Sequence, residues 1–138
     1  MARQRNRINR DAGILVLRLG FGIMFMFHGF PKILGGTEEW EKSGADMQAL
    51  GIHFLPVFWG FMSAFSEFGG GILLILGLFT RIAAGLMFIN MVVAAIVHLS
   101  KDPALLGAAH AIEDGVVFLS IIIIGPGRYS LDAMITGG

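Results

Sequence analysis

The sequence predicts an all-α, polytopic membrane protein built as a bundle of four transmembrane helices. The chain is 55% hydrophobic and only 14% charged, and its mean hydropathy is +0.75. Soluble domains carry about 25% charged residues, so this chain has too little polar surface to stay dissolved. Four of its apolar segments approach the roughly 20 residues that an α-helix needs to cross a bilayer. We expect residues 1–138 to form a single membrane domain.

Prolines bound the first two expected spans. The first span covers residues 12–30 and ends before Pro31, because proline disfavours helical backbone at the residue that precedes it. The second span covers residues 54–79, with Pro56 in its first turn, where the missing N–H costs no helical hydrogen bond. Both segments are rich in phenylalanine and methionine, which suits lipid contact, core filling or contact with a quinone.

The other two spans end at sequences that stop helices. The third covers residues 82–99 and ends at a Ser-Lys-Asp-Pro sequence, and the fourth covers residues 105–124 and ends at a Gly-Pro-Gly sequence. The long connection between the first two spans, residues 31–53, is acidic and contains Trp40. Within it we expect a short interfacial helix over residues 37–50.

The positions of arginine and lysine orient the bundle. Positive residues concentrate on the cytoplasmic side of membrane proteins. Six arginines would lie on the same side as the N-terminus: Arg3, Arg5, Arg7, Arg10, Arg81 and Arg128. Only three lysines would lie on the other side: Lys32, Lys42 and Lys101. This predicts both termini in the cytoplasm and residues 31–53 outside. Beside a membrane span, the N-terminal arginines are expected to fix topology and touch anionic lipid, so nucleic acid is not an expected partner.

Seven ionisable side chains lie inside or at the edges of the expected spans. A charge at the centre of a bilayer costs about 2.5–3.5 kcal/mol on insertion scales, so these groups are expected to pair, face water or bind a ligand. They are Arg18, His28, Glu67, His98, His110, Glu113 and Asp114.

Arg18 and Glu67 are the candidate catalytic residues. At 1.5 Å per residue they lie about 9 Å and about 16 Å from the same membrane surface, within reach of a long arginine side chain. One interpretation is a buried ion pair that sets the helix register. In another, Glu67 accepts a proton at a site for quinone or another ligand, and in a third Arg18 extends to the inner surface.

The histidines form a second group toward the predicted outer side. His110, Glu113 and Asp114 share one helix face, and His28 and His98 end two other spans. Three interpretations stay open: a hydrogen-bonded polar network, a pocket for a redox headgroup or small ligand, and a site for Zn²⁺, Fe²⁺ or Mn²⁺. The candidate cofactor-binding residues are His28, Glu67, His98, His110 and Glu113, and the candidate metal ligands are His28, His98, His110 and Glu113.

Small residues and missing motifs narrow the classes of function. Glycines on the first two spans, Gly20, Gly22 and Gly29 with Gly60, Gly70, Gly71 and Gly77, predict close helix packing. The chain has no cysteine, which excludes disulfides and thiolate metal sites. It also shows no phosphate-binding loop, dinucleotide fingerprint or nucleophile–base pattern, so neither a hydrolase nor a kinase is expected.

Several motifs together resemble those of DoxX-type membrane proteins. They occur in the expected order over residues 13–133: Arg18-Leu19-Gly20, His28-Gly29-x-x-Lys32, Glu67-x-x-Gly70-Gly71, Thr80-Arg81 and Gly125-Pro126-Gly127-Arg128. The resemblance implies a four-span bundle in the inner (plasma) membrane and a link to quinone-coupled electron transfer. It points to Arg18, His28, Lys32, Glu67 and Arg81 without giving any of them a catalytic role.

Three hypotheses of function follow. The first is a small subunit or partner of a quinone-linked redox system, which would be an oxidoreductase only together with a redox protein. The second is a structural or assembly subunit of a larger membrane complex without chemistry of its own. The third is a metal- or small-ligand-binding protein that uses the outer histidine cluster. The expected partners are the lipid bilayer, a membrane or redox protein, and a second copy of the chain.

Overall fold

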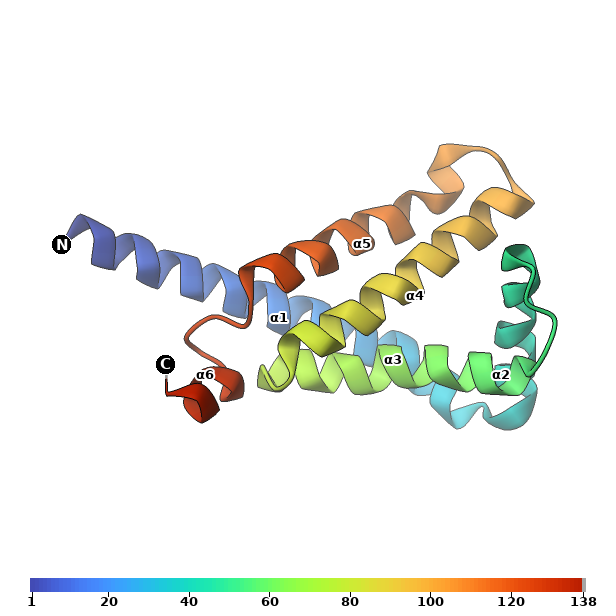
Figure 1. Ribbon diagram of the computed structural model, residues 1–138, viewed down its shortest axis with the longest axis horizontal. Coiled ribbons are helices and arrows are strands. Elements are labelled where there is room, and N and C mark those ends of the chain that lie inside the picture. The colour runs from blue at the N-terminus through green and yellow to red at the C-terminus, as the bar shows by residue number, and fades with distance from the viewer. Residues whose placement is uncertain (138) are drawn as a thin grey trace.

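Four long helices dominate the computed structural model, which describes residues 1–137. They are α1 (Ala2–Leu34), α3 (Pro56–Leu76), α4 (Thr80–Lys101) and α5 (Leu105–Ile124), and each is long and apolar enough to cross a membrane. Three short helices accompany them: α2 (Gly36–Gly44), η1 (Ala45–Leu50) and α6 (Leu131–Thr136). No strand occurs within residues 1–137. The predicted fold class is therefore confirmed, and both termini lie at the same end of the molecule (Figure 1).

The first helix is longer than the sequence predicted. It starts at Ala2, so the arginine-rich N-terminus is helical and projects beyond the other helices (Figure 1). It also continues through Pro31 to Leu34, so the prediction that it ends before Pro31 was wrong. Proline removes one helical N–H here and crowds the carbonyl four residues before it, but the turn that follows is held by Trp40 Nε1, which donates to the Lys32 carbonyl at 2.9 Å. The helix predicted within residues 37–50 is present as α2 and η1.

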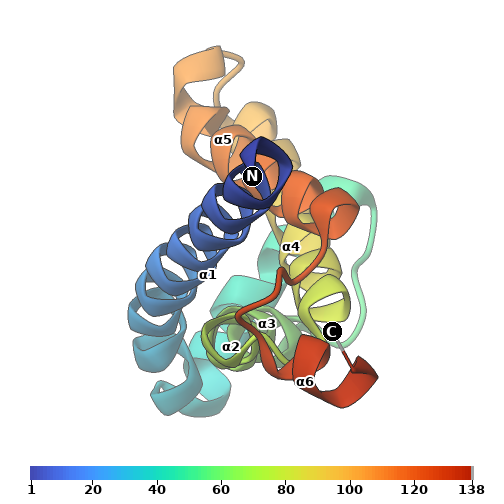
Figure 2. The same cartoon turned by 90° about the vertical axis from the view of Figure 1, so that its left-hand side faces the viewer.

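Neighbouring helices in the sequence are neighbours in space. α1 packs against α3, α3 against α4, and α4 against α5, and Figure 2 shows this arrangement from the end that carries the termini. The contact of α1 with α3 depends on small residues: a Cβ added to Gly22 would lie 2.7 Å from the carbonyl oxygen of Gly71. Gly22 and Gly71 thus pack as predicted, whereas Gly20 has open space beside it.

Aromatic and aliphatic side chains fill the centre of the bundle. Phe118 of α5 packs edge-on against Phe25 of α1, with ring centroids 5.0 Å apart, and closes the bundle between its first and last spans. Leu74 and Met87 are fully buried beside them. Many other large apolar side chains are exposed on the outside, which is the surface that lipid covers in a membrane protein.

Candidate functional site between α3 and α4

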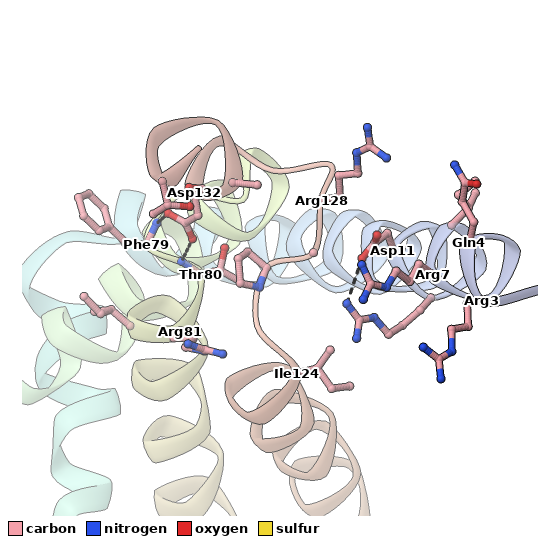
Figure 3. A pocket seen from close by; sticks show the side chains of 17 residues that line it. Arg3, Gln4, Arg7, Asp11, Phe79, Thr80, Arg81, Ile124, Arg128 and Asp132 are labelled. Atoms are coloured by element: carbon pink, nitrogen blue, oxygen red, sulfur yellow. Dashed lines mark hydrogen bonds and ion pairs between the residues drawn. The ribbon is translucent and has the colours of Figure 1, made fainter. Parts of the chain in front are cut away.

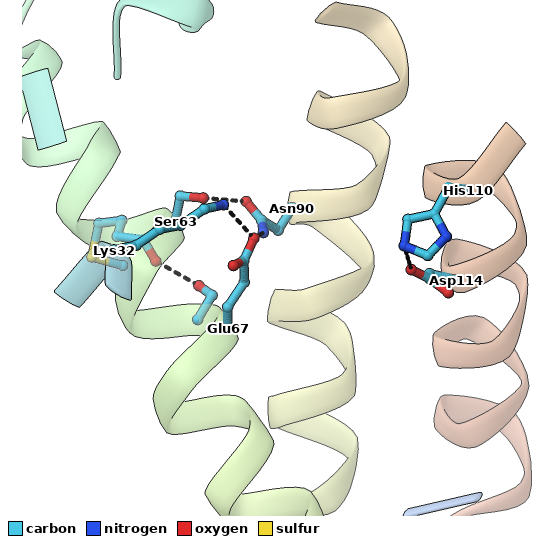
Figure 4. A network of polar contacts seen from close by, with 8 residues as sticks. Lys32, Ser63, Glu67, Asn90, His110 and Asp114 are labelled. Atoms are coloured by element: carbon cyan, nitrogen blue, oxygen red, sulfur yellow. Dashed lines mark hydrogen bonds and ion pairs between the residues drawn. The ribbon is translucent and has the colours of Figure 1, made fainter. Parts of the chain in front are cut away.

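A buried carboxylate lies where three helices meet. Glu67 is near the middle of α3 and only 5% exposed. Its Oε1 accepts hydrogen bonds from Lys32 Nζ of α1 at 2.9 Å and from Asn90 Nδ2 of α4 at 3.0 Å. Ser63, one turn before Glu67, donates to Asn90 Oδ1 at 2.9 Å (Figure 4). One oxygen of Glu67 therefore joins α1, α3 and α4.

The second oxygen of the same carboxylate forms no hydrogen bond with the part of the chain that the structure describes. Glu67 Oε2 is buried and has no hydrogen-bond partner among residues 1–137. Leaving a buried acceptor unsatisfied costs about 1–3 kcal/mol, and more for a charged group. Lys32 offsets part of this cost by neutralising the carboxylate, but it bonds only Oε1. A buried group of this kind requires an explanation, such as a catalytic role or a bound water or ion.

A cavity of about 390 Å³ adjoins this carboxylate. Its volume falls within the range of roughly 300–1,000 Å³ that small-molecule sites occupy. The lining is mixed: Lys32 and Asn90 are polar, whereas Met62, Phe58 and Trp59 are apolar. Toward the end of α4 the lining includes further polar side chains. There His98 lies near an ion pair of 3.1 Å between Lys101 of α4 and Asp46 of η1.

Arg18 belongs to a different network, so the predicted Arg18–Glu67 pair is wrong. The guanidinium is 1% exposed and donates to the carbonyl oxygens of Leu74 at 3.0 Å and Ile75 at 3.3 Å, at the end of α3. It also donates to the carbonyls of Pro126 and Tyr129, both at 2.8 Å. Side chains on a helix tilt toward its N-terminus, which in α1 leads Arg18 away from Glu67. The same tilt leads Lys32 back toward it.

The C-terminal segment completes the Arg18 network. Asp132 of α6 accepts hydrogen bonds from the backbone N–H groups of Phe79 at 2.8 Å and Thr80 at 2.9 Å, and so caps the start of α4. Burial opposes the ionisation of Asp132, but the hydrogen bonds from Thr80 and Phe79 and the nearby Arg18 charge outweigh it and lower its pKa. Arg18 and Asp132 together fasten the C-terminal segment to α3 and α4.

The histidines do not form one pocket, which corrects the sequence prediction. His28 and His110, with ring centroids 6.5 Å apart, line a groove of about 430 Å³ between α1 and α5. His110 Nε2 lies 3.2 Å from Asp114 Oδ2. His98 instead lines the Glu67 cavity, and Glu113 is exposed and lines neither. Figure 4 shows the Glu67 network and the His110–Asp114 pair as separate groups.

Because the histidines lie in two separate places, the structure does not assemble the predicted metal site. Within residues 1–137, no three His, Cys, Asp or Glu side chains gather closely enough to hold a metal ion. A zinc site takes three or four such ligands, and the groove supplies two histidines and Asp114 without that geometry. The four candidate metal ligands are therefore not brought together.

Sequence reasoning missed the partners of Glu67. The prediction that the first helix ends before Pro31 puts Lys32 outside the expected spans, and Asn90 is not among the partners predicted for Glu67. Two signals were available. Ser63 and Glu67 are spaced i, i+4, which places them on one face of α3, and Asn90 is the only side-chain amide in the third span. A polar face on α3 requires a polar partner on the next helix.

Comparison with known proteins supports the resemblance seen in the motifs. The DoxX family model matches residues 13–99. The chain is 29% identical to "Inner membrane protein YqjF" of Escherichia coli over 91% of this chain and 93% of the relative. It is 30% identical to "Inner membrane protein YphA" of the same organism over 89% and 90%.

A third relative carries a name that refers to a reaction. The chain is 34% identical to "Putative oxidoreductase CatD" of Bacillus subtilis, over 72% of this chain and 68% of the relative. No solved structure matches the chain. Since the family model covers more than half of the sequence and the two Escherichia coli relatives align over nearly all of it, this multi-pass membrane protein belongs to the DoxX family.

Proposed function

We propose that this protein is a small inner-membrane subunit or partner of a quinone-linked redox system, and that the cavity between α3 and α4 receives the quinone ring. One observation carries the proposal: the buried Glu67 carboxylate has one oxygen held by Lys32 and Asn90 and one oxygen without a partner. The names of the relatives support an inner-membrane location and, for CatD, an oxidoreductase.

The residues around the cavity suit a quinone headgroup. Such a site needs an apolar cleft with a few well-placed polar groups. Met62, Leu86 and Val93, each within about one turn of Glu67 or Asn90, supply apolar contact surface, and the Lys32 ammonium supplies a donor. Glu67 Oε2 supplies the acceptor that a quinol hydroxyl requires.

The chain's own residues would handle protons. A bound quinol supplies two hydroxyl protons and two electrons. Glu67 Oε2 would accept a hydrogen bond from one hydroxyl group and then its proton, while Lys32 and Asn90 keep the carboxylate oriented through Oε1. The second proton would follow through the same carboxylate after the first has moved on. His98, Asp46 and Lys101 line the cavity toward its exposed end and give that proton a polar route outward. The electrons pass to a separate redox protein, since the chain has no cysteine for an iron–sulfur cluster and no recognisable flavin or haem motif.

Quinone binding tests the proposal directly. Protein purified in mild detergent with its native lipids is expected to retain about one quinone per chain. A photoreactive quinone is expected to label α3 and α4. Glu67→Gln keeps the shape of the side chain but loses its charge, so quinol affinity should fall about tenfold, the value of one charge-assisted hydrogen bond.

The groove between α1 and α5 provides the matched control. His110→Gln changes a polar group of similar size outside the Glu67 cavity and should leave quinol affinity unchanged within about twofold. Labelling confined to α1 and α5, or an equal loss of affinity in both variants, would place the quinone in the groove and overturn the assignment to Glu67. Protein that retains no quinone and takes none up would favour the structural-subunit hypothesis.

A further inference from the structure

A large cationic pocket lies at the end of the molecule that carries both termini, away from Glu67. Its volume is about 1190 Å³, and it is bounded by the start of α1, the turn between α3 and α4, and the segment from α5 to α6. Five arginines line it against two aspartates: Arg3, Arg7, Arg10, Arg81 and Arg128, against Asp11 and Asp132. Figure 3 shows Arg3 and Arg7 on α1 and Arg81 on α4, across the opening.

The two aspartates are already engaged. Asp11 lies 3.7 Å from Arg10, and both oxygens of Asp132 accept backbone N–H groups at the start of α4. Within residues 1–137, Arg3, Arg7 and Arg128 form no ion pair or side-chain hydrogen bond, and Arg81 uses only its Nε, which donates to the Ile122 carbonyl. The pocket therefore has several guanidinium groups free for an anion. Such groups bind phosphate with paired N–H donors.

The rim of the same pocket is apolar. Ile82 and Phe79 at the start of α4, Ile124 at the end of α5 and Ile8 of α1 line it, and all four are large exposed hydrophobic residues. A soluble anion gains nothing from such a rim. A phospholipid does, because its phosphate can meet the arginines while its acyl chains follow the apolar helix surfaces into the bilayer. Basic pockets at the ends of transmembrane helices bind lipid headgroups with more than one phosphate.

We propose that this pocket binds the headgroup of a phospholipid that carries two phosphates. The charge balance favours two phosphates over one, because a single phosphate would leave most of the excess positive charge uncompensated. Arg7 of α1 and Arg81 of α4 hold the headgroup from opposite sides, and Ile82 and Ile124 contact the start of the acyl chains. This binding is independent of the Glu67 cavity and of the proposed redox role.

Lipid titration with native mass spectrometry tests the site. The full chain in detergent would be titrated with cardiolipin, which has two phosphates, with phosphatidylglycerol, which has one, and with zwitterionic phosphatidylcholine. Cardiolipin is expected to bind at least about tenfold more tightly than phosphatidylglycerol, and phosphatidylcholine not measurably. Arg7→Gln should weaken cardiolipin binding about fivefold, since one arginine near an anionic lipid contributes that much.

Arg5 is the matched control, because it lies on the same helical turn as Arg7 and is exposed but does not line the pocket. Arg5→Gln removes the same charge and should leave cardiolipin affinity unchanged within about twofold. Equal losses in the two variants would show diffuse attraction and overturn the pocket. Equally effective binding of inorganic pyrophosphate, which has two phosphates and no acyl chains, would show a site for soluble anions and overturn the lipid assignment.

Discussion

Replacing Arg18 by methionine tests the most heavily bonded side chain in the molecule. Methionine keeps most of the side-chain length and apolar volume but removes every donor. Arg18 donates to four backbone carbonyls, two at the end of α3 and two in the segment that precedes α6. The substitution should therefore loosen the C-terminal segment and destabilise the whole bundle.

The magnitude follows from the carbonyls that lose their partner. Leu74 O also accepts a hydrogen bond from the N–H of Gly77 at 3.2 Å and therefore keeps a partner. The carbonyl oxygens that lose their donor are those of Ile75, Pro126 and Tyr129. Each orphaned carbonyl costs about 1–3 kcal/mol when buried. These three bonds are only partly buried, so water can replace some of them, and the lower end applies. We expect Arg18→Met to lower the free energy of unfolding by about 3 kcal/mol.

Unfolding in detergent, followed by helicity against added dodecyl sulfate, would measure this loss. Arg81→Met is the control, because Arg81 makes one exposed hydrogen bond to a carbonyl and is expected to contribute under about 1 kcal/mol. A loss below about 1 kcal/mol in Arg18→Met, or a loss equal to that of Arg81→Met, would refute the reasoning. Combining Arg18→Met with Glu67→Gln should give additive losses, because these residues share no partner.

Three further predictions concern other contacts. In a double-mutant cycle, Lys32→Met and Glu67→Gln should be non-additive by about 1 kcal/mol or more, since Lys32 Nζ lies 2.9 Å from Glu67 Oε1; simple additivity would show that the pair has no energetic role. Asp132→Asn should destabilise the protein at pH 7. Because the pKa of Asp132 is lowered on folding, its contribution is fully present above the usual aspartate pKa of about 3.9 and is lost as pH falls through the folded value. The gap in melting temperature between wild type and Asp132→Asn should therefore begin to narrow as pH falls below about 4, and a gap independent of pH would contradict the charge argument. Gly22→Ala should cost about 1–3 kcal/mol through overpacking against the Gly71 carbonyl, whereas Gly20→Ala, which has open space, should be neutral or stabilising in the same unfolding assay.

The fold was predictable because the bilayer imposes simple rules on sequence. Length and hydropathy located all four spans, and the helix expected in the connection between the first two spans is present as α2 and η1. The ends of helices were less predictable. Pro31 was read as a stop, but a single missing N–H near the end of a helix is a small loss when the following turn packs well. Trp40 Nε1, which donates to the Lys32 carbonyl at 2.9 Å, helps to hold that turn.

The candidate site was predictable in its residues but not in its pairings. Buried charges in apolar segments identified Arg18 and Glu67, because hydrocarbon makes such residues costly. Their partners depend on the rotation and register of each helix, which composition does not specify. Arg18 and Glu67 lie at similar depths in the bilayer, and this similarity alone predicts that they meet. The same comparison of depths groups His98 with His28 and His110, although His98 lines the Glu67 cavity.

The direction of side chains on α1 explains why Glu67 is paired with Lys32. The side chains of Arg18 and Lys32, the two cations of α1 that bond to α3, extend toward the N-terminus of their helix, but they start from opposite sides of Glu67. Arg18 therefore reaches the end of α3, where backbone carbonyls accept its donors. Lys32 reaches back from the last turn of α1 and bonds one oxygen of Glu67. Arg18, the side chain with the most hydrogen-bond donors, therefore only holds helices together. Glu67 is paired with Lys32, which bonds one of its two carboxylate oxygens and leaves the other free. A methionine at position 18 should consequently lower global stability alone. A methionine at position 32 removes the counter-charge of the buried Glu67 carboxylate, so it should lower stability and also disturb the proposed quinone site.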